Sequence, residues 1–231
     1  MFDLRGFGDQ LLLGALMTVG LSLSILVLGL VIGLFIATAK LSGFKPFRAV
    51  GEVYTAIFRA VPELLIILII YFGSSGILTA IAESFGYDEF VELSPFAAGV
   101  TSLGLVFGAY ASEVFRGAIL AIPKGQIEAA RAYGMNGWLV FRRVVLPQIW
   151  RVALPGLGNL FLVTQKDTAL VSVIGLVELT RAAAIATGFT KAPFTFYFVA
   201  SLLYLAMTSV TMYGQRHAER WARRGQPGLG S

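Results

Sequence analysis

Cysteine is absent from this sequence of 231 residues, and histidine occurs once, as His217. The chain therefore has no disulfide framework and no thiol chemistry, and a metal site or catalytic triad built on histidine is excluded. It also lacks the G-x-x-x-x-G-K-[ST] phosphate loop, which rules it out as a subunit that hydrolyses a nucleotide. We predict no catalytic residue, no metal ligand and no cofactor bound by this chain.

Charged residues are scarce as well. They make up 13% of the chain, whereas hydrophobic residues make up 57% and the mean hydropathy is +0.78. A soluble domain would carry about 25% charged residues. The sequence therefore predicts an all-α integral membrane protein with one transmembrane domain over residues 1–231. The first ten residues contain Asp3 and Asp9 and lack a basic n-region, so we expect the first apolar run to remain as a span.

Long apolar runs are what the sequence has in place of charge. Each of five runs is near or above the ~20 residues that a spanning helix needs. The predicted spans are residues 11–39, 53–80, 95–115, 152–174 and 194–213, with a connecting loop at residues 116–151. The segment at residues 175–193 mixes apolar with charged residues. Either a half-inserted helix or a loop on the lipid headgroups fits that mixture.

Basic residues lie on one side of this five-span arrangement. The segment after the first span, the loop at residues 116–151 and the C-terminal tail hold 13 of the 18 Lys and Arg residues. The connection after the second span has none and carries Glu83, Asp88, Glu89 and Glu92. The positive-inside rule then places the N-terminus outside and the C-terminus in the cytoplasm.

The loop at residues 116–151 contains a short amphipathic helix in an otherwise polar stretch. Residues 126–133 are rich in helix formers, Pro123 precedes them and Gly134 follows. Ile127 and Ala130 share one narrow apolar face. Such a helix suits docking into a groove of another protein, and an ordinary interfacial helix is the alternative.

The spacing across this loop resembles the EAA loop of bacterial ABC-importer permeases. The matching residues are Gln126, Glu128, Ala129, Ala130, Gly134, Leu146 and Pro147, with Val144 where the family pattern has Ile. In that family the loop is a coupling helix that sits in a cleft of a cytoplasmic ATPase. The resemblance implies the same role for these residues.

Ionisable residues inside the predicted spans each call for a partner or a function. Arg59 and Glu63 are four residues apart around Pro62, so we expect them to pair on one helix face. The run from Arg59 to Pro62 resembles the Arg-Gly-(Thr/Val)-Pro signature of polar amino-acid permeases, with Ala60 in place of Gly. A gating role and a structural ion pair both fit.

Two further runs resemble segments of the same subfamily. Gly108–Gly117 is similar to GAY-x-x-E-x-x-RG. We expect Glu113 to anchor the cytoplasmic end of this span, and Tyr110, one turn deeper, to border the path. Lys166–Leu170 is similar to K-D-T-(S/A)-L.

Adjacent residues on a helix point about 100° apart. Lys166 and Asp167 at mid-membrane therefore favour a kinked or locally unwound helix. We expect Asp167 to bind a cationic substrate group, and the predicted substrate path consists of Asp167, Lys166, Thr164, Thr168 and Tyr110. A lysine–aspartate pair that only stabilises the fold is the alternative.

Together these motifs cover nearly the whole chain and resemble an ABC-importer permease for polar, basic amino acids or opines. The resemblance implies the type I importer permease fold and alternating access. Its implied partners are two ATPase subunits that bind ATP and Mg, a second permease subunit and a periplasmic amino-acid-binding protein. It implies the bacterial inner membrane as location and no nucleic acid as partner.

Three other functions remain open from the sequence. The first is an ion-gradient-driven transporter, a class that often has inverted repeats, which this chain does not display. The second is a membrane enzyme, but no set of residues capable of catalysis lies at one depth of the membrane. The third is a structural subunit without a substrate path, which the charges of Lys166 and Asp167 at mid-membrane disfavour.

Overall fold

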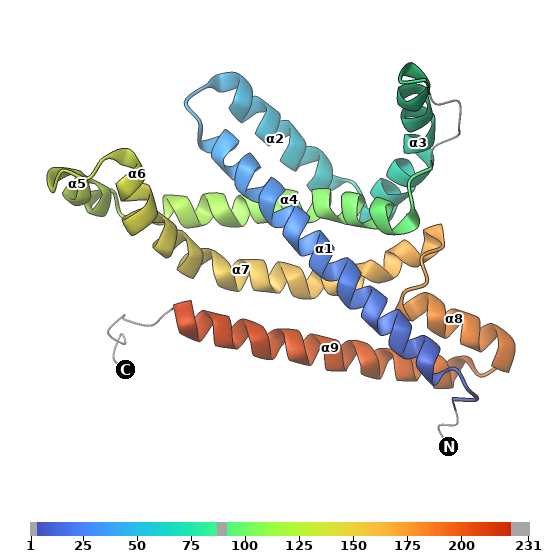
Figure 1. Cartoon of the computed structure of the whole chain (residues 1–231). Coiled ribbons are helices and arrows are strands. Elements are labelled where there is room, and N and C mark those ends of the chain that lie inside the picture. Colours follow the sequence, from blue (N-terminus) through green and yellow to red (C-terminus); the bar gives the residue numbers. More distant parts are fainter. Residues whose placement is uncertain (1–3, 87–91, 223–231) are drawn as a thin grey trace.

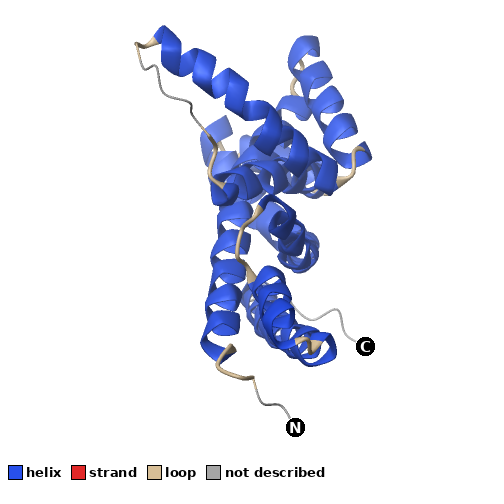
Figure 2. Ribbon diagram, turned by 90° about the vertical axis from the view of Figure 1, so that its right-hand side faces the viewer, coloured by secondary structure: helices blue, strands red, loops and turns tan. Residues whose placement is uncertain are grey.

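A computed structural model describes residues 4–86 and 92–222 of the chain (Figure 1). Within these ranges every regular element is a helix, and no strand is present (Figure 2). The elements are α1 (Gly8–Leu41), α2 (Lys45–Ala60), α3 (Glu63–Ser84), α4 (Pro95–Leu120), α5 (Lys124–Ala132), α6 (Gly137–Val140), η1 (a π-helix, Phe141–Val145), α7 (Leu146–Asp167), η2 (a 3₁₀-helix, Thr168–Ile174), α8 (Leu179–Thr190) and α9 (Pro193–Ala222). Asp88, Glu89, Arg223 and Arg224, which enter the charge pattern, lie outside the described residues.

The number of apolar helices agrees with the prediction of five spans. In the described part of the chain, α1, α3, α4 and α9 are each long and apolar enough to cross a membrane. The stretch at residues 137–174 and α8 are bent by 51° at a short break, and they make a fifth span when the pair is counted as one. The segment at residues 175–193 is therefore largely helix, which excludes the simple loop among the two alternatives.

The second predicted span, residues 53–80, is wrong as a single helix. The chain leaves the helical conformation at Val61 (φ −86°, ψ 133°), and α3 begins after Pro62. A residue that precedes proline is sterically excluded from the α region, and proline has no N–H to continue the helix. Arg59 and Glu63 consequently lie in different helices, and no ion pair joins them among the described residues.

Helices α1 and α4 approach each other closely at small residues. A Cβ atom added at Gly33 would lie 2.8 Å from the Cβ of Ala111, and one added at Gly108 would lie 2.7 Å from Ile32. Both separations are shorter than a van der Waals contact, so glycine is required for this backbone distance. Gly29 and Gly33 of α1 and Gly104 and Gly108 of α4, each pair four residues apart, thus pack these two helices within the chain.

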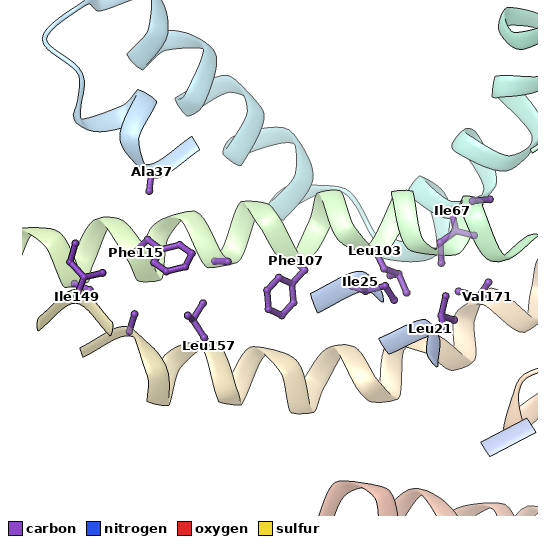
Figure 3. Close-up of a cluster of buried hydrophobic side chains, with 14 of the residues drawn as sticks. Leu21, Ile25, Ala37, Ile67, Leu103, Phe107, Phe115, Ile149, Leu157 and Val171 are labelled. Atoms are coloured by element: carbon purple, nitrogen blue, oxygen red, sulfur yellow. The ribbon is translucent and has the colours of Figure 1, made fainter. Parts of the chain in front are cut away.

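The larger core lies between α1, α4 and α7, with a contribution from α3 (Figure 3). Leu21 and Ile25 of α1, Phe107 of α4 and Leu157 of α7 are all at least 96% buried. A second cluster joins α1, α8 and α9 through residues such as Leu11, Leu179 and Phe196. The larger cluster keeps α3, α4 and α7 in contact, and Glu63 at the start of α3 and Asp167 at the end of α7 line one cavity.

A buried carboxylate, which the sequence analysis did not single out, fixes α8. Glu178 caps the helix by accepting hydrogen bonds from the backbone N–H of Thr180 (2.9 Å) and of Arg181 (2.8 Å). It also accepts one from the Tyr204 hydroxyl at 3.0 Å, which ties α8 to α9. The backbone N–H of Leu179 donates to Thr18 Oγ1 of α1 at 3.2 Å. Sequence alone signals only an acidic residue before a helix, which is typical of an N-cap.

Candidate functional site

A cavity of about 290 Å³ lies between α3, α4 and α7. Two carboxylates, Glu63 at the start of α3 and Asp167 at the end of α7, face this cavity together with Tyr110 and Thr164. The remaining walls are apolar and consist of Leu103, Val106, Phe107, Leu160 and Val163. Two carboxylates at the edge of an apolar space can pair with a cationic group of a ligand. The cation then leaves water without becoming an unpaired buried charge.

Asp167 occupies a change of helix type. The α-helix α7 ends at this residue, and the backbone continues as the 3₁₀-helix η2 until Gly175, whose φ is +98°. This confirms the predicted local irregularity around Lys166 and Asp167. A 3₁₀ segment is frequent at the C-terminal end of an α-helix, and here it places Asp167 at the junction of the two helix types.

The structure brings only some of the predicted path residues together. Asp167, Thr164 and Tyr110 line the cavity. Lys166 is exposed and is not among the lining residues. Thr168 is fully buried, and its hydroxyl donates to the carbonyl of Gln165 at 2.8 Å. The roughly 100° between successive helical positions explains why the Lys166 side chain leaves the side that Asp167 faces.

A second, polar hollow of about 580 Å³ adjoins this cavity at Tyr110. Its lining includes Lys40, Glu52, Arg59, Glu113 and Arg116. The guanidinium carbon of Arg59 lies 5.3 Å from the centre of the Tyr110 ring, which is within cation–π range. We expected Arg59 to pair with Glu63. It instead contacts Tyr110, which lines both the cavity and the polar hollow.

Glu113 belongs to an ion cluster that connects α1, α2 and α4. Its carboxylate accepts from Arg116 at 2.8 Å, as a cytoplasmic anchor would, and also pairs with Lys40. Lys40 further contacts Glu52 at 3.0 Å and Thr55 Oγ1 at 3.0 Å. The side chain of Lys40 is only 4% exposed. The sequence places Lys40 just beyond the first predicted span, where basic residues are common. The pairing of Lys40 with Glu113 was therefore not predicted.

Replacing Lys40 with methionine is expected to lower the free energy of unfolding by about 3 kcal/mol, because a buried charge partner is removed from Glu113. Thermal unfolding of the purified protein measures this change. Glu52→Gln serves as the matched control, since the Glu52 side chain is 60% exposed and an exposed ion pair contributes at most about 1 kcal/mol. Equal destabilisation by both variants would contradict the structural role assigned to Lys40.

The predicted amphipathic helix of the loop is α5, and it ends as expected at Gly134. The φ of Gly134 is +78°. Its N–H bonds to the carbonyl of Arg131 at 2.9 Å, and the N–H of Met135 bonds to that of Ala130 at 3.2 Å. This pair of bonds is a Schellman motif, in which the left-handed position favours glycine. Substituting Gly134 would therefore strain the end of the helix.

Helix α5 is attached to α7 on one side and open on the other. Ala130 is 6% exposed, and Ile127 packs against the larger core. The Nε2 of Gln148 in α7 donates to the Oε1 of Gln126 in α5 at 2.7 Å. Glu128 and Ala129 are exposed. The arrangement can transmit a movement of α5 to the beginning of α7 while presenting Glu128, between the exposed Lys124 and Arg131, to a partner.

The Leu-Pro pair at the end of the loop coincides with a change in helical hydrogen bonding. Pro147 has no N–H, so it cannot donate to a carbonyl four residues earlier. Just before it the chain forms the π-helix η1, and the N–H of Leu146 reaches back five residues to the carbonyl of Phe141. The π-turn is a point at which the loop meets the span, and such turns are frequent at functional sites.

The sequence matches the family described as "Binding-protein-dependent transport system inner membrane component" over residues 29–224. It is 49% identical to the nopaline transport system permease protein of Agrobacterium fabrum over 95% of this chain and 94% of that protein. It is 43% identical to the histidine/lysine/arginine/ornithine transport system permease protein of Salmonella typhimurium over 90% of this chain and 91% of that protein.

Solved structures agree with this assignment. An amino acid ABC transporter crystallised with histidines has a chain with a TM-score of 0.78 and 35% identity, over 92% of this chain and 94% of that chain. A chain of a methionine ABC transporter in an inward-facing conformation has a TM-score of 0.74 over 94% and 98%, and at 19% identity it supports the fold alone. The chain therefore belongs to the family of inner membrane components of binding-protein-dependent transport systems, the permeases of ABC importers.

Proposed function

We propose that this permease forms part of the path for amino acids or opines that carry a cationic group. The observation that carries the proposal is the cavity between α3, α4 and α7, in which Glu63 and Asp167 are the acidic residues. Relatives named for lysine, arginine and ornithine transport support it, because these amino acids have cationic side chains at neutral pH. Relatives named for nopaline and octopine extend the candidate substrates to opines.

Transport by this chain requires further subunits in our proposal. The complex contains two ATPase subunits that bind ATP and Mg, and one of them docks on α5, where Glu128 is exposed. A second permease, either a copy or a sibling, completes the path, and a periplasmic binding protein delivers the substrate. The basic segments of the chain support an orientation with α5 in the cytoplasm, in the bacterial inner membrane.

Alternating access is the mechanism that this arrangement supports. ATP-driven closure of the ATPases would move α5, and the Gln126–Gln148 hydrogen bond would carry the movement to α7. Asp167 at the far end of α7 would then change its position relative to Glu63 of α3. The change from α-helix to 3₁₀-helix at Asp167 gives the chain a place to bend.

Substrate uptake by the reconstituted complex tests this function. We expect ATP-dependent uptake of radiolabelled arginine into vesicles, with competition by unlabelled lysine, ornithine, nopaline or octopine and little by glutamate or leucine. Uptake that follows an ion gradient without ATP would favour a secondary transporter instead. Effective competition by glutamate, with none by the cationic compounds, would contradict the assignment of the acidic cavity.

Tyr110 and Arg59 are the proposed barrier between the cavity and the polar hollow. A cation–π contact contributes about 0.5–2 kcal/mol, so its loss is expected to raise the rate of substrate leakage by roughly 2- to 30-fold. Efflux of preloaded arginine without ATP measures this in Tyr110→Leu. The Tyr110→Phe variant keeps the ring and should leak as little as the parent protein. Equal efflux from the Leu variant and the parent would remove Tyr110 from the barrier.

A further inference from the structure

Two hollows on the side formed by α7 and α9 share Trp150. The first, of about 340 Å³, is lined by Leu26, Leu30, Trp150, Leu154, Leu157, Gly158, Phe161, Thr211, Gly214, Gln215 and Ala218. The second, of about 580 Å³, is lined by Leu146, Pro147, Trp150, Arg151, Trp221 and Ala222. Helices α7 and α9 run alongside each other in Figure 1. We refer to the two hollows together as the α7–α9 groove.

The chemistry of the groove changes along its length. Leucines of α1 and α7 and Phe161 make its inner part apolar. At the other end are Trp150, which is 41% exposed, Trp221, which is 59% exposed, and the half-buried Arg151. Tryptophan is enriched where a membrane meets water, and arginine binds phosphate through a planar fork of donors.

The charge near the outer part of the groove is predominantly positive. Arg151 lines this end of the groove, Arg142 and Arg143 belong to η1 directly before α7, and Arg216 and Arg220 line a separate hollow on α9 with Glu219. The acidic residue on that part of α9 is Glu219, which accepts a hydrogen bond from Gln215 Nε2 at 2.8 Å. An anionic group at this end would therefore experience a net attraction.

Two polar side chains of the inner part form hydrogen bonds within the protein. Gln215 uses its amide on Glu219, and the Thr211 hydroxyl donates to Gln165 Oε1 at 3.2 Å. The lining of the inner part is otherwise mostly apolar, and a chain of methylenes needs no polar partner. A Cβ atom added at Gly214 would meet nothing within 4 Å, so the groove is open at that position.

We propose that the α7–α9 groove binds one phospholipid. An acyl chain lies along Leu30, Phe161 and Gly214, and the phosphate of an anionic headgroup contacts Arg151 between the two tryptophans. The apolar lining of the inner part suits an acyl chain, and the two tryptophans with Arg151 at the other end suit a headgroup. The polarity of a phospholipid, apolar in its acyl chains and anionic at its phosphate, follows that of the groove.

Lipid retention by the intact complex tests the site. The full complex is reconstituted with equal amounts of phosphatidylglycerol and phosphatidylcholine, purified, and examined by native mass spectrometry. We expect one retained phosphatidylglycerol per copy of this chain. Arg151→Gln should reduce the preference for phosphatidylglycerol about fivefold. Gly214→Leu, which fills the inner part, should reduce retention of both lipids.

Matched controls separate binding from folding. Arg48→Gln removes an exposed cation from α2, and Gly20→Leu adds a side chain in open space on α1, so both should retain lipid as the parent does. Retention by Gly214→Leu equal to that of Gly20→Leu would overturn the proposal, and so would the absence of any preference for phosphatidylglycerol.

A cross-linking experiment identifies the occupant directly. Benzoylphenylalanine placed at Trp221 in the assembled complex should form its photoproduct with lipid. A photoproduct with an ATPase or permease subunit would instead show that protein covers the groove, and the proposal would be wrong.

Discussion

Replacing Asp167 with asparagine is expected to reduce ATP-driven uptake of arginine by about 100-fold. Asn has nearly the same shape, so the cavity keeps its volume while one of its two carboxylates becomes neutral. Removing one member of a buried, hydrogen-bonded charge pair costs 2–5 kcal/mol, and every 1.4 kcal/mol corresponds to a factor of ten. Uptake into proteoliposomes, with the amount of assembled complex determined in parallel, measures the loss.

The neighbouring residue provides the control for this experiment. Lys166→Gln changes the charge at the same depth of the membrane, but Lys166 is exposed and outside the lining of the cavity. We expect its uptake to stay within about threefold of the parent protein. If Lys166→Gln abolished uptake while Asp167→Asn did not, the cavity described here would not be the substrate site.

Reversing the charge of Glu128 is expected to reduce uptake at least 30-fold by uncoupling the permease from its ATPases. Glu128 is exposed on α5, while Ala130 and Ile127 of the same helix pack against the rest of the chain. Glu128→Lys therefore leaves the internal packing intact and changes the surface that a partner would meet. Like charges brought together at an interface cost several kcal/mol.

Two measurements distinguish uncoupling from misfolding. Membrane abundance of Glu128→Lys should equal that of the parent, whereas retention of the ATPase subunits during purification should fall. Glu128→Gln, which removes the charge without reversing it, should have an intermediate effect on both retention and uptake. Normal uptake by Glu128→Lys would contradict the role of α5 as the coupling helix.

Hydrophobic periodicity and charge were sufficient to predict the five-span class and the amphipathic helix in the loop. A long apolar run in a bilayer has few possible conformations, because its backbone N–H and C=O groups must form hydrogen bonds within a helix. The end of α5 was also predictable, because Gly134 occupies a left-handed position that glycine favours. The break between α2 and α3 was readable from Pro62, yet the apolar run across it suggested one continuous helix.

The composition of the ion pairs was not predictable from local spacing. Arg59 and Glu63 are four residues apart, but Pro62 places them in separate helices, where one contacts Tyr110 and the other faces Asp167. Glu113 finds Lys40, which is 73 positions away in the chain. Side chains so far apart in the sequence come into contact only when their helices pack together. The spacing in the sequence therefore does not predict such a contact.

The sequence by itself determined that this protein spans the membrane, that its basic loop contains a short exposed helix, and that carboxylates occur within its spans. Each of these depends on composition or on neighbours within one or two helical turns. Only the tertiary structure decided which charges share a space. The close approach of α1 and α4 at Gly33 and Gly108 and the shared core with α7 bring Glu63 and Asp167 to one cavity and leave Lys166 outside it. Helix packing fixes that outcome, because it sets the rotation of each helix about its own axis.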